Sequence, residues 1–150
     1  MLREEIKNAM KEAMKAKDTV TLSTTRMVLS SIKNKDVEVR VKGKEEADDA
    51  DILSILQNMV KQRRDSVKMY LEGGREELAA KENEEISVIE RFLPKQMSEA
   101  EIEAIVAETI AATGAASMKD MGKVMGAIRG KYAGQMDFGI ASAKIKAQLS

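Results

Sequence analysis

The sequence contains no cysteine and no histidine. The absence of cysteine excludes a disulfide framework, a thiolate zinc site and a cysteine nucleophile. The absence of histidine removes the commonest general base and metal ligand. With two tyrosines, two phenylalanines and no tryptophan, the chain also lacks the aromatic platforms on which runs of single-stranded bases stack. We therefore expect a protein that has no catalytic residues of its own and needs no metal or cofactor.

The sequence also lacks an excess of charge of one sign and any apolar run long enough to span a membrane. The sequence has 25 basic and 25 acidic residues. Overall charge therefore predicts no partner, and a nucleic-acid surface would have to be a local patch. The N-terminus shows no signal-peptide core, so we expect a cytoplasmic protein with no membrane contact. A chain of 150 residues, 33% charged and 43% hydrophobic, is typical of a soluble globular protein.

Pro94 is the only proline, and helical patterning fills both sides of it. Proline lacks the N–H that a helix needs and biases the preceding residue away from helical geometry. We therefore expect an N-terminal helical domain over residues 1–93 and a C-terminal domain over residues 94–150. The predicted fold class is all-α: an N-terminal bundle of about four helices with a long helical hairpin, followed by a small C-terminal three-helix domain.

The first two helices are predicted from apolar residues that recur every three or four positions over 2–14 and 22–32. Asp18 or Thr19 can cap the second helix, and Asn34 is its expected end. The short turn between the two helices favours an antiparallel pair.

Residues 35–50 break this pattern. Val37, Val39 and Val41 alternate with charged neighbours, as in a strand. Because no partner strand is present anywhere, we expect an extended or frayed loop. The acidic run that follows suits the N-terminus of a helix.

The clearest helical periodicity runs over residues 52–71 and stops at Gly73-Gly74. A further helix from about Arg75 is expected to fold back on it. Beyond Pro94, three short helices are predicted. The first is expected to begin at a capping box of Ser98 and Glu101 and to end at Gly114, and the second to begin at a box of Ser117 and Asp120. Glycines at 130, 134 and 139 are expected to bracket the turn before the third.

Catalytic groupings are poorly supported by the pattern. Glu76-Glu77 and Glu84-Glu85 sit among lysines and arginines, and we interpret them as surface charge. Ser23, Thr24 and Thr25 lie near Arg26, but no strained elbow or oxyanion loop surrounds them, so a helix face is the simpler interpretation.

Two basic clusters are candidates for RNA contact. The first wraps the middle of the long helix and consists of Lys61, Gln62, Arg63, Arg64 and Lys68, of which Lys61, Arg63 and Arg64 are the candidates. Pairing with Asp65, Glu72 and acids on the neighbouring helix is the simpler interpretation. The second consists of Lys119, Lys123, Arg129, Lys131, Lys144 and Lys146. From Lys119 to Lys146 the sequence has six basic residues and two acidic ones. This local excess of positive charge suits either contact with phosphates or plain solubility. Gly122 and Gly126 within it either admit a ligand's backbone or let helices pack tightly.

Three blocks of sequence, in order, resemble a known family. They are Arg26-Met27 with Ile32-Lys33-Asn34; Tyr70, Gly73-Gly74-Arg75 and Leu78 with Phe92-Leu93-Pro94-Lys95-Gln96; and Met121-Gly122-Lys123-Val124-Met125-Gly126. The chain resembles the GatB/YqeY family, and specifically its free-standing YqeY-like members. In that family the same module forms the tail of the B subunit of the tRNA-dependent amidotransferase, a carbon–nitrogen ligase with glutamine as amido donor. There the tail grips tRNA while the chemistry occurs in a separate catalytic cradle.

The resemblance implies an all-helical N-terminal domain, a small three-helix domain and RNA contact through Lys119, Lys123, Arg129 and Lys131. Our expectation is a non-catalytic module that binds tRNA or structured RNA. One alternative is a module that docks on a larger enzyme or synthetase, for which Met118, Met121, Met125 and Met136 either expose an apolar groove or fill the core. A second alternative is an accessory to glutamine-dependent tRNA amidotransferase activity.

Overall fold

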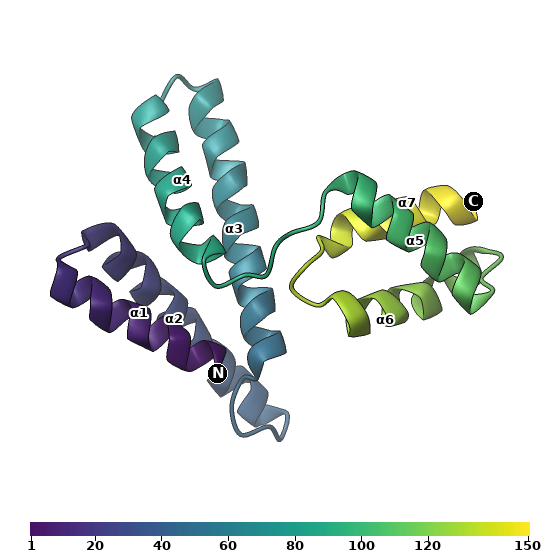
Figure 1. Cartoon of the computed structure of the whole chain (residues 1–150), viewed down its shortest axis with the longest axis horizontal. Helices are drawn as coiled ribbons and strands as arrows, with labels where there is room; N and C mark the ends of the chain where they lie inside the picture. The colour runs from purple at the N-terminus through teal and green to yellow at the C-terminus, as the bar shows by residue number, and fades with distance from the viewer. The chain divides into compact units, whose positions relative to one another are not determined.

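The computed structural model describes residues 1–150 and is built entirely from helices (Figure 1). Seven α-helices and one 3₁₀ helix follow one another, with no strand, which confirms the all-α class. The chain divides into two compact units, Met1–Pro94 and Lys95–Ser150, called here the N-terminal and C-terminal units. None of the helices combines the length and apolar composition needed to cross a membrane.

The N-terminal unit contains four helices: α1 (Leu2–Ala16), α2 (Thr19–Val41), α3 (Asp49–Glu72) and α4 (Glu76–Glu90). α1 and α2 lie side by side, and α3 and α4 form a long hairpin (Figure 1). Asp18 caps α2, since its carboxylate accepts the N–H of Thr21 at 3.1 Å. Gly74, at φ 71°, takes the left-handed conformation that ends α3. The largest fully buried side chains of this unit are Ile6, Val28, Ile32, Ile52, Leu56 and Ile89.

The predicted end of the second helix at Asn34 is wrong, because α2 continues to Val41. The predicted loop over residues 35–50 is therefore wrong for residues 35–41 and confirmed for residues 42–48, between α2 and α3. Ile32, Asp36 and Val39 recur at helical spacing and are buried at 1%, 8% and 6% exposure. The apolar stripe therefore continues, with a carboxylate occupying one of its positions. The Asp36 carboxylate accepts hydrogen bonds from groups distant in the sequence. Because these partners cannot be seen locally, the alternation of valines wrongly indicated an extended segment.

The C-terminal unit contains α5 (Glu99–Thr113), the 3₁₀ helix η1 (Met118–Asp120), α6 (Met121–Tyr132) and α7 (Phe138–Leu149). Ser98 caps α5 by accepting the Glu101 N–H at 3.2 Å, and Gly114, at φ 69°, ends it. Residues following Pro94 belong to this unit: the Met97 N–H donates to the Gln135 carbonyl at 2.9 Å, on the α6–α7 connection. The core of the unit consists of Ile102, Val106, Val124, Met125, Ile128, Met136, Ala141 and Ile145.

Candidate nucleic-acid interface

Three glycines form an exposed stripe along α6. Gly122, Gly126 and Gly130 recur every fourth residue, so they share one face of the helix. A Cβ built on any of them meets no atom within 4 Å, so tight packing inside this unit does not require glycine there. Each glycine lowers helix stability by about 0.5–1 kcal/mol relative to alanine. The explanation that Gly122 and Gly126 let helices pack is therefore wrong within this unit, and their face is open to approach from outside.

Two of the predicted RNA-binding cations flank this stripe. Arg129 follows Gly126 by three residues and Gly122 by seven, while Lys123 precedes Gly126 by three and Gly130 by seven. Because residues three, four and seven apart share a side of a helix, the two cations lie on opposite borders of the glycine face. The Lys123 ammonium also donates to the Thr113 carbonyl at 3.1 Å, at the end of α5. This bond holds one border of the face in place.

The other predicted cations of α6 and η1 lie further from the stripe. Lys131 lies beyond Lys123 around the helix, and its ammonium is 5.5 Å from the centroid of the Tyr132 ring. Lys119 is exposed on η1. Both therefore extend the positive surface without bordering the glycines.

The two acids in this stretch cap helices. Asp120 accepts the N–H groups of Ala116 and Ser117 at 2.9 and 3.3 Å, and these bonds hold its pKa below the usual range. Asp137 accepts the N–H groups of Gly139 and Ile140 at 2.8 and 3.3 Å, at the start of α7. Both carboxylates are thus directed toward backbone amides.

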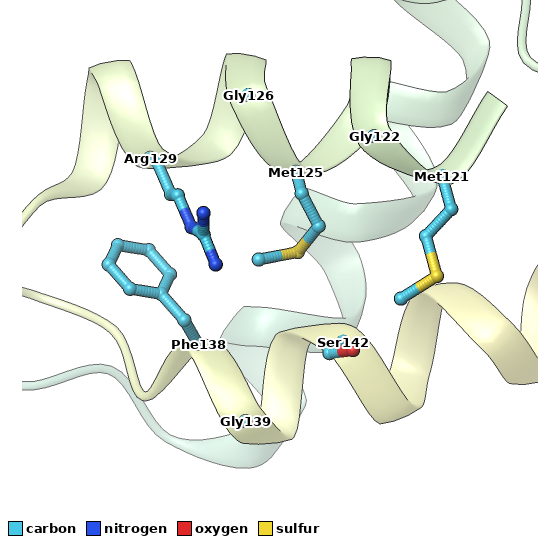
Figure 2. Close-up of a pocket in the computed structure, with 8 residues that line it drawn as sticks. All are labelled: Met121, Gly122, Met125, Gly126, Arg129, Phe138, Gly139 and Ser142. Carbon is cyan, nitrogen blue, oxygen red and sulfur yellow. The ribbon is translucent and has the colours of Figure 1, made fainter.

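A groove of about 640 Å³ lies between α6 and α7 (Figure 2). Its lining comprises Met121, Gly122, Met125, Gly126 and Arg129 from α6, with Phe138, Gly139 and Ser142 from α7. The Arg129 guanidinium carbon is 5.9 Å from the centroid of the Phe138 ring, within the range of a cation–π contact. The groove adjoins the glycine stripe, because Gly122 and Gly126 belong to both.

The predicted cations of α7 differ in their surroundings. Lys144 forms an ion pair with Glu103 on α5, at 3.9 Å. Lys146 follows Ser142 by four residues, so it lies one turn beyond the groove on the same side of α7. The structure thus brings Lys146 toward the groove and gives Lys144 an acidic partner.

The basic cluster of the N-terminal unit is largely paired with α4. Arg63 donates to Glu85 at 3.0 Å, with side chains only 13% and 14% exposed. Arg64 donates to Glu90 at 2.9 Å, and Lys61 is exposed. We therefore leave Arg63 and Arg64 out of the candidate interface, because acids of the hairpin pair with both, and Lys61 alone no longer forms a cluster.

Of the three hydroxyl residues considered as nucleophiles, Ser23 is exposed and donates to the Val20 carbonyl at 3.2 Å, while the other two lie inside the N-terminal unit. Thr24 and Thr25 are fully buried, and the Thr25 hydroxyl donates to the Thr21 carbonyl at 2.7 Å. This bond occupies the hydroxyl proton within the helix, as in ordinary helix packing.

Sequence reasoning missed the α7 side of the groove. Local charge and composition identify neither Phe138 nor Ser142, although Phe138, Ser142 and Lys146 are spaced by four residues and therefore share a face. That spacing was the available signal. The spacing alone does not show that this face of α7 lines a groove, because the groove is formed only by the packing of α7 against α6.

These features define an all-helical, two-unit protein whose C-terminal unit presents a glycine-rich basic helix beside an open groove. The chain belongs to the YqeY-like protein family, whose model matches residues 3–149. It is also similar to proteins named "Altered inheritance of mitochondria protein 41, mitochondrial". The relative from Lachancea thermotolerans is 36% identical over 107 residues, which is 70% of this chain and 56% of that protein.

Two further relatives of the same name come from Vanderwaltozyma polyspora and Saccharomyces cerevisiae. Each is 36% identical over 88 residues, covering 59% of this chain and 46% of the relative. The chain therefore aligns with about half the length of these curated relatives.

Proposed function

We propose that this chain binds tRNA or another structured RNA through its C-terminal unit and has no catalytic activity of its own. The observation that carries this proposal is the exposed glycine stripe of α6, bordered by Lys123 and Arg129. A helix face without side chains lets a sugar–phosphate backbone come close, while the bordering cations contact its phosphates. The resemblance to the amidotransferase tail points to the same class of ligand.

The glycine stripe gives this proposal its physical basis, since charge alone is also explained by solubility. An exposed glycine destabilises a helix and improves no packing inside this unit. Three such glycines on one face are readily understood if a partner occupies the space that their side chains would fill. Lys119, Lys131 and Lys146 would add phosphate contacts around that face.

Charge reversal in the full-length chain tests the proposal. A variant with Lys119, Lys123, Arg129 and Lys131 changed to glutamate is expected to lose tRNA binding while its helicity by circular dichroism is retained. The matched control changes four exposed lysines of the N-terminal unit, Lys11, Lys15, Lys33 and Lys81, to glutamate. Both variants have the same net charge, so any difference in affinity reports the position of the changed residues. The control keeps the cations of the C-terminal unit and is therefore expected to bind tRNA at least tenfold more tightly than the first variant. Equal affinities of the two variants would overturn the assignment to the C-terminal unit.

A protein-docking module is the second candidate function, and exposed apolar residues of the N-terminal unit favour it. Met69 and Leu71, close to the α3–α4 turn, are 72% and 55% exposed. Docking through such residues depends little on salt, whereas RNA binding through phosphates weakens steeply with it. The accessory amidotransferase role would require glutamine-dependent amidation that appears only when a catalytic partner subunit is added.

The cytoplasm is the compartment we propose for this activity. The relatives' names assign those proteins to mitochondria. Fluorescent tagging of the full-length chain in its own cells is expected to give a diffuse cytoplasmic signal, and a signal confined to mitochondria would contradict this.

A further inference from the structure

The groove between α6 and α7 has two chemically distinct parts. Met121 and Met125 from α6 and Phe138 from α7 form an apolar wall, and their side chains lie between the two helices (Figure 2). The Arg129 guanidinium lies beside the Phe138 ring at one end. A ligand that fits this wall has a flat apolar surface joined to a negative charge.

The size and openness of the groove limit the ligand further. Its volume of about 640 Å³ lies in the range of small-molecule sites, which is roughly 300–1,000 Å³. Gly122 and Gly126 on the α6 side have open space where a side chain would stand, while beside Gly139 on the α7 side the Asp137 carboxylate lies 3.1 Å from that position and accepts backbone N–H groups. A group attached to a longer chain can therefore enter while that chain passes over the open glycine face of α6.

We propose that this groove receives one unpaired nucleotide of the bound RNA, with its base against Phe138, Met121 and Met125 and its phosphate at Arg129. This inference rests on the proposed RNA-binding function and deepens it. Folded RNA is recognised mainly at loops and bulges, where an unstacked base lies on an aromatic ring or a guanidinium plane. Arginine also matches phosphate geometry better than lysine does.

The charge around the groove favours this occupant over an apolar peptide. Lys123 borders the adjoining glycine stripe, and Lys146 lies one turn beyond Ser142 on the groove side of α7. Phe138 is the only aromatic residue in the lining, so the groove can stack one base and not a run of bases. This fits a chain with four aromatic residues in total, two tyrosines and two phenylalanines.

The test uses the full-length chain and two RNA hairpins that differ by one nucleotide. One hairpin is fully paired, and the other carries a single unpaired 2-aminopurine, whose fluorescence reports stacking. The wild-type chain is expected to bind the bulged hairpin about tenfold more tightly, a typical effect of one stacked base. The 2-aminopurine fluorescence is expected to change on binding.

Substitutions at Phe138 separate stacking from packing. Phe138→Leu keeps an apolar side chain but removes the aromatic face, and it is expected to abolish the preference for the bulged hairpin. Phe138→Tyr keeps the ring and is expected to retain the preference. The matched control is Phe92→Leu, which removes the ring of the other phenylalanine, in the N-terminal unit, and is expected to retain the preference too.

The outcomes distinguish this inference from the proposed function. Equal affinity for the two hairpins, or an unchanged fluorescence on tight binding, overturns the nucleotide groove while RNA binding stands. The groove would then suit an apolar helix of a protein partner. Absence of binding to either hairpin and to tRNA overturns both proposals together.

Discussion

The Arg3 guanidinium on α1 donates hydrogen bonds to both carboxylate oxygens of Asp36 on α2, at 3.0 and 2.8 Å. The two side chains are only 17% and 12% exposed. Ala47 joins this pair, because its carbonyl accepts from Arg3 at 3.2 Å and its N–H donates to Asp36 at 2.8 Å. One ion pair thus ties the first helix, the second helix and the segment that leads into α3.

We predict that this ion pair makes the N-terminal unit sensitive to acid. The Arg3 hydrogen bond, aided by the Ala47 N–H, lowers the pKa of Asp36 to about 2, against about 3.9 in an unfolded chain. Because the pKa is lower in the folded state, the stabilisation is fully present above about pH 4 and is lost as the pH falls toward 2. The expected loss is about 1–2 kcal/mol, measured by urea denaturation at pH 5 and pH 2.5.

Asp36→Asn is the control for this pH dependence. The variant is expected to be less stable at pH 5, because the mostly covered Arg3 guanidinium loses its carboxylate partner at 2.8 Å and keeps only the exposed Glu46, at 3.7 Å. It is also expected to lose less stability than the wild type between pH 5 and 2.5. Parallel losses in the two proteins would show that other carboxylates dominate.

The ion pair between Arg63 and Glu85 is predicted to stabilise the α3–α4 hairpin. Both side chains are mostly buried, so we expect a coupling free energy of about 1–2 kcal/mol in a double-mutant cycle with alanine. The neighbouring pair Arg64–Glu90 joins the same helices but is 61% and 44% exposed. Its coupling is expected below about 0.5 kcal/mol. Equal coupling free energies for the two pairs would contradict the claim that burial strengthens the Arg63–Glu85 pair.

Gly126→Ala is predicted to stabilise the fold and weaken RNA binding. The added Cβ meets nothing within 4 Å, so the helix is expected to gain about 0.5–1 kcal/mol. In the proposed interface the same methyl group holds the RNA backbone away. Urea denaturation and tRNA filter binding on one preparation measure both effects, and a stabilised variant with undiminished affinity would argue against the glycine stripe as a contact surface.

Gly114→Ala is the opposite case and is predicted to destabilise the C-terminal unit. Gly114 ends α5 at φ 69°, a left-handed conformation that costs other residues about 1–2 kcal/mol. Its added Cβ also meets nothing within 4 Å, so backbone strain alone separates it from Gly126. Urea denaturation is expected to show a loss of about 1 kcal/mol.

The helix ends were predictable because their causes are local. Asp18 and Ser98 accept N–H groups three residues ahead, and Gly114 adopts the conformation that glycine favours. The end of α2 was not predictable in this way. Asp36 extends the helix through Arg3 and Ala47, which lie 33 and 11 residues away in sequence.

The candidate interface was predictable in part for the same reason. Lys123 and Arg129 were identified from local charge, and helical spacing alone relates them to Gly126. The groove depends on the packing of α7 against α6, so the pairing of Arg129 with Phe138 required the structure. Local charge makes Arg63 a candidate for RNA contact, and only the packing of α4 against α3 identifies its partner as Glu85, 22 residues away.

The salt dependence of tRNA binding by the full-length chain tests the central claim most directly. Phosphate contacts by Lys119, Lys123, Arg129, Lys131 and Lys146 predict that the logarithm of the binding constant falls linearly with the logarithm of salt concentration, with a slope of about −4. We expect measurable binding at low salt and this slope by filter binding. Absence of binding at low salt, or a slope near zero, would contradict the account.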